Sequence, residues 1–519
     1  MIIIELNYNN AYKWMSKNDI YVIGYIFYKN KVYKNEELLE FVSAIDEDKL
    51  ENTIKEVDGC FSIVYKKKQK IILISDLLRT FPVFYSINNS DIIIKDNIMA
   101  FEKKELDYGA EIELTSSCYV TKDRTIFLNI KQLEGHQIVF INTKTFDVEK
   151  KRYFEFKYNF DNNSTDEEFF KEFDRLWNIV AKRVIMYLNG RRAVIPLSGG
   201  QDSRLLAYYL KKNNYDNIVS YTYGSLNNSE KKKKKKVAEF LNIEWHFIEY
   251  RNESMQKKFY DKNLYSKMAD YCGRGFSVPI IQEWEAITKL LEEKIIDKEC
   301  VMIPGFTGDF LSGSHLYDDI YLKQNLTFED LTNVIWKYHY SYANITKERF
   351  EKINGNIIND FECKTREDLI NRLEKFDFQE RQAKYITNYS RTYDYQGLEW
   401  VLPFWSKEII YKWLTVPLEK RYKRKLCNEF ANYIYGDLME YAPIYNKKSG
   451  PRIKPPFIVA KLIYKIYDRY KNGFLNFYGY FYFRTYIKYL LFTRKVDYNK
   501  MFAIHYIKYL KRVEKENIQ

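Results

Sequence analysis

The hydrophobic pattern changes character part-way along the chain. Up to about residue 156, short apolar runs, several of them alternating with polar residues, predict β-strands. The strands expected in this part are 21–27, 61–65, 71–75, 92–94, 118–120 and 137–141. From residue 168 to about 189, apolar residues recur at helical spacing instead, so the sequence predicts a long helix there.

A polar segment, residues 159–166, separates these two parts and contains Ser164 and Thr165 shortly ahead of Glu167 and Glu168. Hydroxyl residues followed by acidic ones are typical of a helix start, so we place a domain boundary here. Beyond residue 190, predicted strands and helices alternate. The strands are 194–197, 218–223, 244–248 and 301–303, and the helices are 204–212 and 229–242. This alternation predicts right-handed βαβ units and a parallel sheet.

The turn after the first of these strands carries the strongest chemical signal. It reads Ser198-Gly199-Gly200-Gln201-Asp202-Ser203 and opens a predicted helix. Two adjacent glycines let backbone N–H groups converge on one anion, and the helix N-terminus adds partial positive charge. The spacing is neither that of a Walker loop nor that of a dinucleotide fingerprint. The turn therefore predicts a phosphate cradle at the carboxyl end of a strand.

Composition narrows the function classes. Of 519 residues, 46% are apolar and 18% aromatic, which indicates a globular chain, and no apolar run approaches the ~20 residues that span a bilayer. Glu5 and several asparagines follow a very short apolar run at the start, which does not resemble a signal peptide, so we expect a cytoplasmic location. The six cysteines have neither paired spacing nor nearby histidines, which argues against a disulfide framework or a zinc site. They are Cys60, Cys118, Cys272, Cys300, Cys363 and Cys427.

The net charge of +13 raises the question of nucleic acid or an anionic membrane as a partner. Lysines are spread along the whole chain, so the charge is mainly compositional. The run Lys231–Lys236 falls inside a predicted helix, where six consecutive lysines must point to every face. We therefore favour a solvated helix surface over a nucleic-acid site.

The glycine-rich turn resembles Ser-Gly-Gly-x-Asp-Ser, the PP-loop of ATP pyrophosphatases in the asparagine synthetase superfamily. The resemblance implies that the loop holds the pyrophosphate of ATP and that the adenine lies near Tyr223. The residues expected to bind ATP are Leu197, Ser198, Gly199, Gly200, Asp202, Ser203, Tyr223 and Gly305.

Residues 304–313 begin with a second resemblance, to the family segment Ser-Gly-Glu-Gly-x-Asp-Glu, in which Gly305 and Asp309 match. The resemblance implies that Asp202 and Asp309 hold Mg²⁺ beside the phosphates, as few carboxylates suffice for this ion. Two acidic positions of the family are Phe306 and Phe310 here. We therefore expect a larger or less polar acyl substrate than aspartate.

Two further segments bear weaker resemblance. Residues 399–404 are similar to Glu-x-Arg-x-Pro-Phe, with Glu399 kept and Val401 in place of the arginine. Residues 446–450 resemble Arg-x-Lys-x-Gly, whose lysine faces the phosphates, which assigns that role to Lys448 with Lys447 one position away. The resemblance thus implies Lys448 and Glu399 as catalytic residues.

The N-terminal part resembles the glutaminase domain of asparagine synthetases, through residues 58–65, 76–79, 82–85 and 133–136. Active members use an N-terminal cysteine as nucleophile, but Ile2 follows Met1 here. Cys60 lies in an apolar strand pattern and is expected to be a small buried hydrophobe. We therefore expect a structural domain or docking surface without glutaminase activity.

Together these observations predict an α/β protein of three parts. Residues 1–158 form an Ntn-hydrolase-like sandwich, and 166–450 form an adenine-nucleotide hydrolase-like domain with a parallel sheet. Residues 451–519 form a basic, aromatic, helical extension. We expect the extension to pack on the protein, with peripheral contact to an anionic membrane as the alternative.

The resemblance implies an ATP-dependent ligase that adenylates a carboxylate and transfers ammonia or an amine to it. The acid is a small molecule, a peptide or a sugar acid. The first alternative is an intramolecular cyclase of the β-lactam synthetase or lasso-peptide type. An RNA-modifying PP-loop enzyme and a non-catalytic nucleotide-binding protein are further alternatives.

Overall fold

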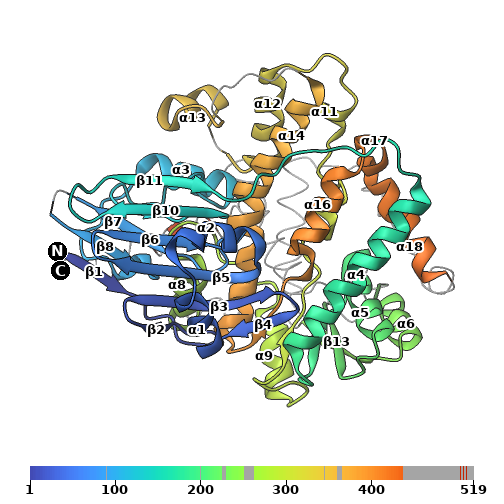
Figure 1. Ribbon diagram of the computed structural model, residues 1–519. Coiled ribbons are helices and arrows are strands. Elements are labelled where there is room, and N and C mark those ends of the chain that lie inside the picture. Colours follow the sequence, from blue (N-terminus) through green and yellow to red (C-terminus); the bar gives the residue numbers. More distant parts are fainter. Residues whose placement is uncertain are drawn as a thin grey trace, which may run out of the picture.

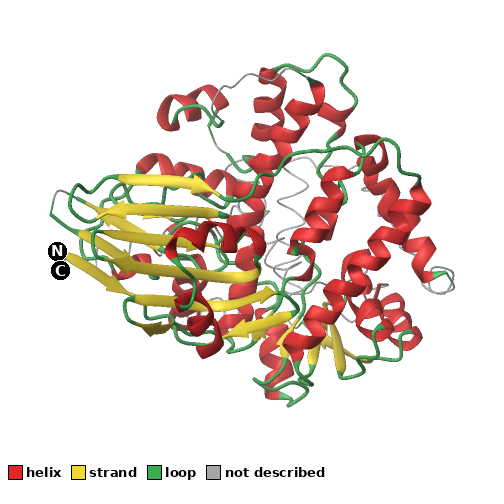
Figure 2. Cartoon of the chain, viewed as in Figure 1, coloured by secondary structure: helices red, strands yellow, loops and turns green. Residues whose placement is uncertain are grey.

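Strands gather in the N-terminal part of the chain and helices dominate the rest, as the computed structural model shows (Figures 1 and 2). It describes residues 1–88, 90–198, 200–224, 230–250, 262–343, 345–358 and 365–436, together with residues 503, 506, 507 and 510.

The N-terminal part contains two stacked sheets. One has the order β11-β10-β6-β5-β3-β2, with β4 also paired to β3, and the other has the order β1-β8-β7-β9. The strands are β1 (Ile2–Glu5), β2 (Met15–Lys17), β3 (Ile20–Tyr28), β4 (Lys31–Lys34), β5 (Asp58–Lys67), β6 (Lys70–Ser75), β7 (Phe84–Ile87), β8 (Ile92–Lys95), β9 (Lys131–Gln132), β10 (Gln137–Asn142) and β11 (Val148–Arg152). The helices are α1 (Glu36–Ser43), α2 (Glu47–Glu56), η1 (Ile98–Ala100) and α3 (Tyr108–Ser117).

Alternating apolar residues explain the stacking of these layers. On β6, Leu73 faces the four-stranded sheet and packs in one apolar cluster with Ile94 of β8. Its neighbour Ile74 faces the other way and packs with Leu38 of α1 and Ile54 of α2. The layered α/β fold expected from the sequence is therefore confirmed in this part.

One predicted strand, residues 118–120, is wrong. Cys118 ends α3 in a left-handed conformation with φ of 76°, so the chain turns there. Only Tyr119 makes a bridge, to Ser277. An apolar triplet that follows a helix is buried by packing and does not need a sheet.

The remainder of the chain is built on a parallel five-stranded sheet in the order β14-β13-β12-β15-β16, which confirms the predicted α/β class. The strands are β12 (Ala193–Pro196), β13 (Ile218–Gly224), β14 (Glu244–Glu249), β15 (Val301–Met302) and β16 (Glu399–Trp400). The helices are α4 (Asp166–Leu188), α5 (Gln201–Lys212), α6 (Glu230–Phe240), α8 (Lys262–Gly273), α9 (Trp284–Glu292), α10 (Gly308–Leu311), α11 (Asp318–Tyr321), α12 (Phe328–His339), α13 (Lys347–Asn354), α14 (Arg366–Phe376), the π-helix η2 (Asp377–Ile386), η3 (Thr387–Tyr389), α15 (Ser390–Tyr395), η4 (Pro403–Trp405), α16 (Lys407–Thr415), α17 (Leu418–Arg421), η5 (Tyr422–Arg424) and α18 (Lys425–Tyr435).

The long helix α4 begins where the sequence predicts. Thr165 caps it by accepting the N–H of Glu168, and the Glu168 side chain accepts the Thr165 N–H in return. The apolar face of α4 then packs on α5, α16 and α18.

The two parts share one continuous apolar core. Its members include Tyr12 near β2 and Trp400 of β16, whose rings meet edge to face at 5.3 Å. Tyr12 also accepts the N–H of Trp400. The helical run that starts with α14 passes between the N-terminal strands and the rest of the molecule (Figure 1).

Part of the C-terminal extension joins this core. Ala503, Tyr506, Ile507 and Leu510 are helical and buried, and the Gly275 N–H donates to the Tyr506 hydroxyl at 2.8 Å. These four residues thus face the protein. The rest of this extension, for which helices were also predicted, lies outside the described residues.

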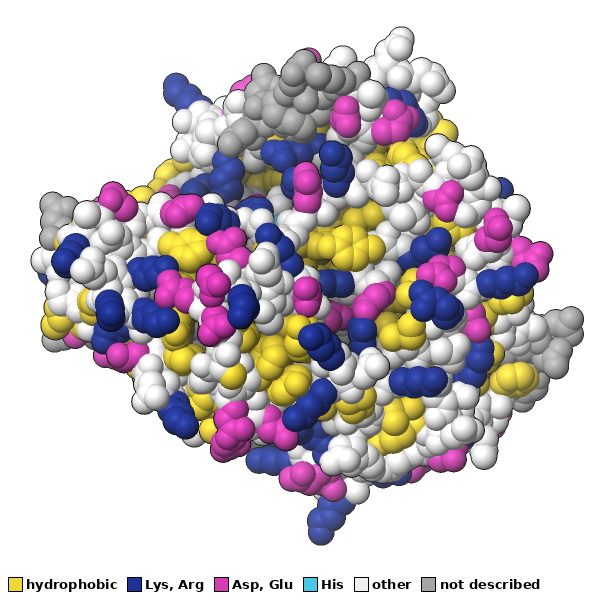
Figure 3. Space-filling view, viewed as in Figure 1, with side chains coloured by type: hydrophobic (Ala, Val, Ile, Leu, Met, Phe, Trp, Pro, Cys, Tyr) yellow, Lys and Arg dark blue, Asp and Glu magenta, His cyan; other side chains and the backbone are white. Residues whose placement is uncertain are grey.

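Surface charge follows composition. Lys234 in the lysine run is buried, and Lys231 lies 4.2 Å from the Phe247 ring centre, so this helix leans on its own sheet. On the face shown in Figure 3, basic and acidic side chains are interspersed. Among the described helices, none combines the length and apolar character needed to cross a membrane.

Candidate active site

The glycine-rich turn lies at the carboxyl end of β12 and starts α5. The Ser198 N–H donates to the Ser203 hydroxyl at 3.0 Å, and the Gly200 N–H donates to the Ser198 hydroxyl at 3.2 Å. Gly200 is the N-cap of α5, and no side chain caps this helix. The N-terminal N–H groups of α5 are therefore suited to an anion. Gly199 lies outside the described residues.

A second loop, residues 304–309, packs directly against this turn because two of its residues are glycines. A Cβ on Gly305 would lie 2.7 Å from the Ser203 nitrogen, and one on Gly308 would lie 2.7 Å from the Asp202 carboxyl carbon. Only glycine allows backbones to approach this closely. The two loops that the sequence singled out therefore form one surface.

Asp202 and Asp309 meet where these loops touch. Burial, with a contribution from the Asp309 charge, raises the pKa of Asp202 to about 6, although Arg424 donates to its carboxylate at 2.7 Å. A second cation beside Asp202 and Asp309 would therefore stabilise their charged forms. Two carboxylates plus phosphate oxygens are a usual Mg²⁺ environment. The residues fit Mg²⁺ in this respect, while the described residues hold no cluster of three or more metal-ligating side chains.

A cavity of about 350 Å³ opens beside the two loops. Its walls come from the PP-loop turn, loop 304–309, α9, and the helical run η2–α15. The lining residues are Pro196, Ser198, Asp202, Ser203, Glu283, Pro304, Gly305, Phe306, Thr307, Asp309, His315, Arg381, Gln382, Ile386, Tyr389 and Tyr393. The structure thus brings Ser198, Asp202, Ser203, Gly305 and Asp309 together at one cavity.

Glu283 is an acid in this cavity that the motifs did not reveal. One of its oxygens accepts the hydroxyls of Tyr393 at 2.7 Å and Tyr221 at 3.0 Å. Burial raises the pKa of Glu283 to about 7, although both phenols stabilise its charged form. A carboxyl group with this pKa can hold or release a proton near neutral pH.

Opposite the PP-loop, a polar network rises from the π-helix η2. The Asp377 carboxylate accepts hydrogen bonds from His315 Nδ1 at 2.6 Å and from the Gln382 amide at 2.8 Å. Burial raises the pKa of Asp377, but the charge and hydrogen bond of His315, with the charges of His339 and Arg381, outweigh burial and lower it. The other ring nitrogen of His315 lies 3.4 Å from Arg381. The Asp377 carboxylate raises the pKa of His315 against the effect of burial. Basic groups therefore line this wall, and π-helical turns often mark functional sites.

Two other predicted residues, Leu197 and Tyr223, do not line the cavity. Leu197 is buried and continues the β12 pairing, with its N–H donating to the Tyr221 carbonyl at 2.8 Å. Tyr223 is half-buried at the end of β13 and stacks on Tyr250 at 4.8 Å. Lys448 lies outside the described ranges, so its role stays a prediction.

Glu399 is placed at the other end of the sheet. It pairs with Val301, which pairs with Ala193, the first residue of β12, whereas the PP-loop follows the last. Its carboxylate binds Arg191 at 2.8 Å and the Tyr187 hydroxyl at 2.7 Å. These contacts give Glu399 a structural role away from the PP-loop, so we leave it out of the catalytic residues proposed below.

In the N-terminal sandwich, Cys60 is buried on β5 and accepts the Tyr25 hydroxyl at 3.2 Å. Burial raises the pKa of its thiol well above the usual value, which disfavours a reactive thiolate. The expectation that Cys60 is a buried hydrophobe is therefore confirmed.

A PP-loop turn beside a carboxylate pair, on a parallel sheet, defines a nucleotide-binding α/β domain. Residues 186–441 match the family described as asparagine synthase, and this match places that part of the chain in the asparagine synthetase superfamily. Membership supports ATP-dependent amide formation in general terms. No match was found among curated proteins.

Three solved structures illustrate a distant similarity to this chain. An NH3-dependent NAD synthetase from Campylobacter jejuni is 17% identical over 36% of this chain and 77% of its own, with a TM-score of 0.20. An NMN synthetase from Francisella tularensis is 14% identical over 42% and 93%, with a TM-score of 0.20. A glutamine phosphoribosylpyrophosphate amidotransferase from B. subtilis is 8% identical over 49% and 77%, with a TM-score of 0.19. Similarity at this level carries no information on activity.

Proposed function

We propose that this protein is an AMP- and pyrophosphate-forming ligase that joins a carboxylate to ammonia or an amine, without glutaminase activity of its own. The carrying observation is the single cavity that Ser198, Asp202, Ser203 and Asp309 share with the acid Glu283 and the base His315. ATP would lie with its β- and γ-phosphates in the PP-loop. Mg²⁺ held by Asp202 and Asp309 would neutralise phosphate charge.

In the first step, a substrate carboxylate oxygen attacks the α-phosphorus of ATP. The bond to the β-phosphate oxygen breaks, pyrophosphate leaves, and an acyl-adenylate forms. The α5 N-terminus and Lys448 would stabilise the charge that moves onto the pyrophosphate. Arg381, on the opposite wall, is placed to hold an anionic part of the acyl substrate.

In the second step, the amine nitrogen attacks the acyl carbon and AMP leaves with the electrons of the C–O bond. The nitrogen must lose one proton. Glu283, whose pKa is about 7, and His315, backed by Asp377, are the two groups in the cavity suited to accept it. The aromatic wall formed by Phe306, Tyr389 and Tyr393 favours a substrate with apolar surface.

The absence of glutaminase activity is supported by the state of the thiols. Within the described ranges, Cys60, Cys118, Cys272 and Cys300 are buried, and the partly exposed Cys427 lies beside the PP-loop, where its thiol contacts Gln201. Burial raises the pKa of the thiols of Cys60, Cys272, Cys300 and Cys427, which disfavours a reactive thiolate at these positions. The nitrogen would therefore come from free ammonia or from an amine.

The test is to incubate the full chain with ATP, Mg²⁺ and a set of carboxylic acids, with ammonium or primary amines, and to separate the nucleotides. We expect AMP and pyrophosphate that depend on the acid, and no product with Asp202→Asn. Formation of ADP would contradict the proposal. A product that forms without any added amine would favour the intramolecular cyclase instead.

A further inference from the structure

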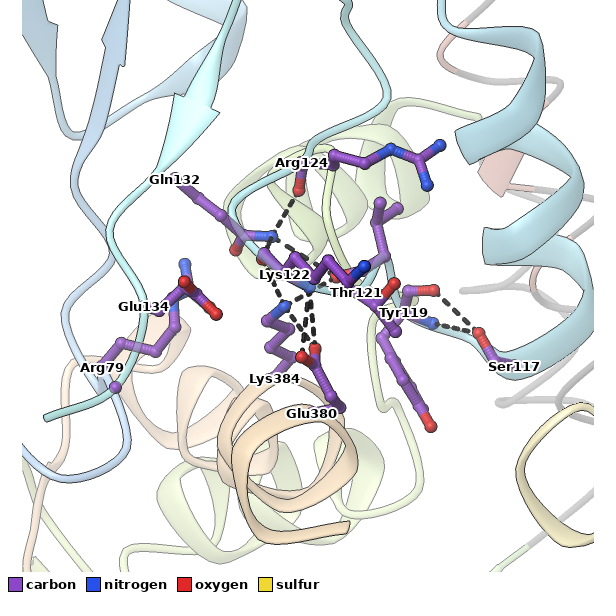
Figure 4. A network of polar contacts seen from close by, with 12 residues as sticks. Arg79, Ser117, Tyr119, Thr121, Lys122, Arg124, Gln132, Glu134, Glu380 and Lys384 are labelled. Atoms are coloured by element: carbon purple, nitrogen blue, oxygen red, sulfur yellow. Dashed lines mark hydrogen bonds and ion pairs between the residues drawn. The ribbon is translucent and has the colours of Figure 1, made fainter. Parts of the chain in front are cut away.

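The π-helix η2 has two faces with different surroundings. Arg381 and Gln382 line the cavity, whereas Glu380 and Lys384 point toward residues 120–124 of the N-terminal part (Figure 4). One short helix thus forms a wall of the proposed active site and also a contact between the two parts of the chain.

Lys384 is completely buried and makes three hydrogen bonds. Its Nζ donates to the carbonyls of Val120 at 3.0 Å and Lys122 at 2.6 Å, and to Glu380 at 2.6 Å. The Lys122 N–H donates in turn to both carboxylate oxygens of Glu380, each at 3.1 Å. These contacts fasten the π-helix to the loop at two points one helical turn apart.

The loop itself is held by the sandwich. Gln132 of β9 is fully buried, and its side-chain amide donates to the carbonyls of Lys122, at 3.3 Å, and Arg124 (Figure 4). Next to it, the Tyr119 hydroxyl lies 2.9 Å from a ring nitrogen of His339 on α12. The loop is therefore a rigid support for the π-helix.

A second set of contacts leads from the π-helix to the PP-loop. The Thr307 hydroxyl donates to the Gln382 side chain, and Thr307 precedes Gly308, which packs on Asp202. A shift of the π-helix would therefore reach the loop that carries Asp309.

From these contacts we infer that the N-terminal sandwich serves the synthetase site as a scaffold, with Lys384 as the positioning residue that clamps the π-helix to it. This inference rests on the proposed function, because it assigns ATP to the cavity. Lys384 does not contact the cavity, so it would act through Gln382 and Thr307.

The test is Lys384→Met in the full chain, with MgATP as the probe in calorimetry. We expect MgATP to bind about tenfold more weakly. Amide hydrogen exchange should rise in residues 304–309 and 377–386. Lys384→Met removes the cation that pairs with the buried Glu380 carboxylate, which can prevent folding, so the double variant Glu380→Met with Lys384→Met is made beside it.

Lys407 provides a matched control. It is also a buried lysine that joins the two parts, donating to the carbonyls of Ile54, Lys55 and Val57, but its helix α16 does not line the cavity. Lys407→Met should lower the melting temperature and leave MgATP affinity within about twofold of the wild type.

Equal losses of MgATP affinity in the Lys384 and Lys407 variants would overturn the clamp, since both would then act through stability alone. A folded double variant with unchanged affinity and exchange would overturn it as well. If the wild-type protein does not bind MgATP, the proposed function is contradicted instead. The role of Lys384 is then decided by amide hydrogen exchange in residues 304–309 and 377–386, compared between the wild type and the Lys384 variant.

Discussion

Asp76 in the N-terminal sandwich and Asp202 at the PP-loop are both buried, and burial raises the pKa of each to about 6. Their surroundings differ. Asp76 accepts the backbone N–H groups of Phe61 at 2.9 Å and Leu78 at 2.7 Å and the hydroxyl of Thr80. Asp202 has Arg424 on one side and a cavity on the other.

A shifted pKa alone therefore does not identify a reactive site. At Asp76, hydrogen bonds from the protein itself occupy the carboxylate oxygens, so this side chain fixes the conformation of the surrounding backbone. At Asp202, the cavity leaves room for a ligand, so the same electrostatics can serve chemistry. The two parts of the chain divide in this way, one toward structure and one toward reaction.

The largest expected effect comes from the carboxylate pair. Asp202→Asn and Asp309→Asn should each lower acid-dependent AMP formation by roughly a thousandfold or more, because phosphate charge loses its cation. The double variant should be no worse than the worse single one, since the two act as a unit. Simple additivity in single-turnover AMP formation would show that they serve separate sites.

Lys448→Ala should lower turnover by roughly a hundredfold or more with a modest change in ATP affinity, since the lysine stabilises charge on the leaving pyrophosphate. Lys448→Arg should be milder, and Lys447→Ala should be mild. Single-turnover AMP formation measures this. If Lys447→Ala forms no AMP while Lys448→Ala still does, Lys447 and not Lys448 is the lysine that stabilises the leaving pyrophosphate.

Glu283 gives a pH-dependent stability. Its pKa is raised from 4.5 to about 7 in the folded protein, so the stabilisation from its bound proton is full below about pH 4.5 and lost as pH rises through about 7. Glu283→Gln cannot ionise and should therefore be more stable than the wild type at pH 8, by about 3 kcal/mol, with a smaller difference at pH 5. Urea unfolding at both pH values checks this, and equal differences at the two would refute it.

Asp76→Asn tests the structural side of the comparison. Both carboxylate oxygens of Asp76 accept hydrogen bonds, and asparagine replaces one of them with an amide nitrogen that cannot accept, so we expect a loss of about 2 kcal/mol in unfolding free energy. Mg-ATP affinity should stay unchanged, in contrast with Asp202→Asn. If Asp76→Asn weakened nucleotide binding without lowering stability, the N-terminal part would contribute to ligand binding and its purely structural role would be refuted.

Cys60→Ala should have the smallest effect, about 1 kcal/mol from the lost packing of a small buried side chain. Glutamate release from glutamine should be undetectable in both the wild type and the variant. Glutamine turnover that disappears with Cys60→Ala would show a working glutaminase and overturn this interpretation.

Sequence predicted the parts of the site that are contiguous in the chain. The Ser-Gly-Gly-x-Asp-Ser turn and the Gly305–Asp309 loop carry their own spacing, and alternating strands and helices place both at the carboxyl ends of a parallel sheet. Glu283 and Arg381 come from α9 and η2, far along the chain, and only the fold brings them to the cavity. A glutamate at the start of a helix rich in apolar residues was the one local signal for Glu283.

Glu399 shows the converse. Its short motif resembles a family segment. The pairing register of its strand, however, decides at which end of the sheet Glu399 lies, and a register cannot be derived from one strand alone. Residues 118–120 show that apolar composition alone does not separate a strand from a buried turn.

The shared core has a consequence for how the chain is made. Tyr8 binds Asp394, its partner 386 residues later, and Arg391 beside it. At a synthesis rate of about 5–20 residues per second, the ribosome needs roughly 20 to 80 s to supply these partners after Tyr8 emerges. For that time the N-terminal sandwich would present an uncovered aromatic surface to the cell, which makes the nascent chain a natural client for chaperones.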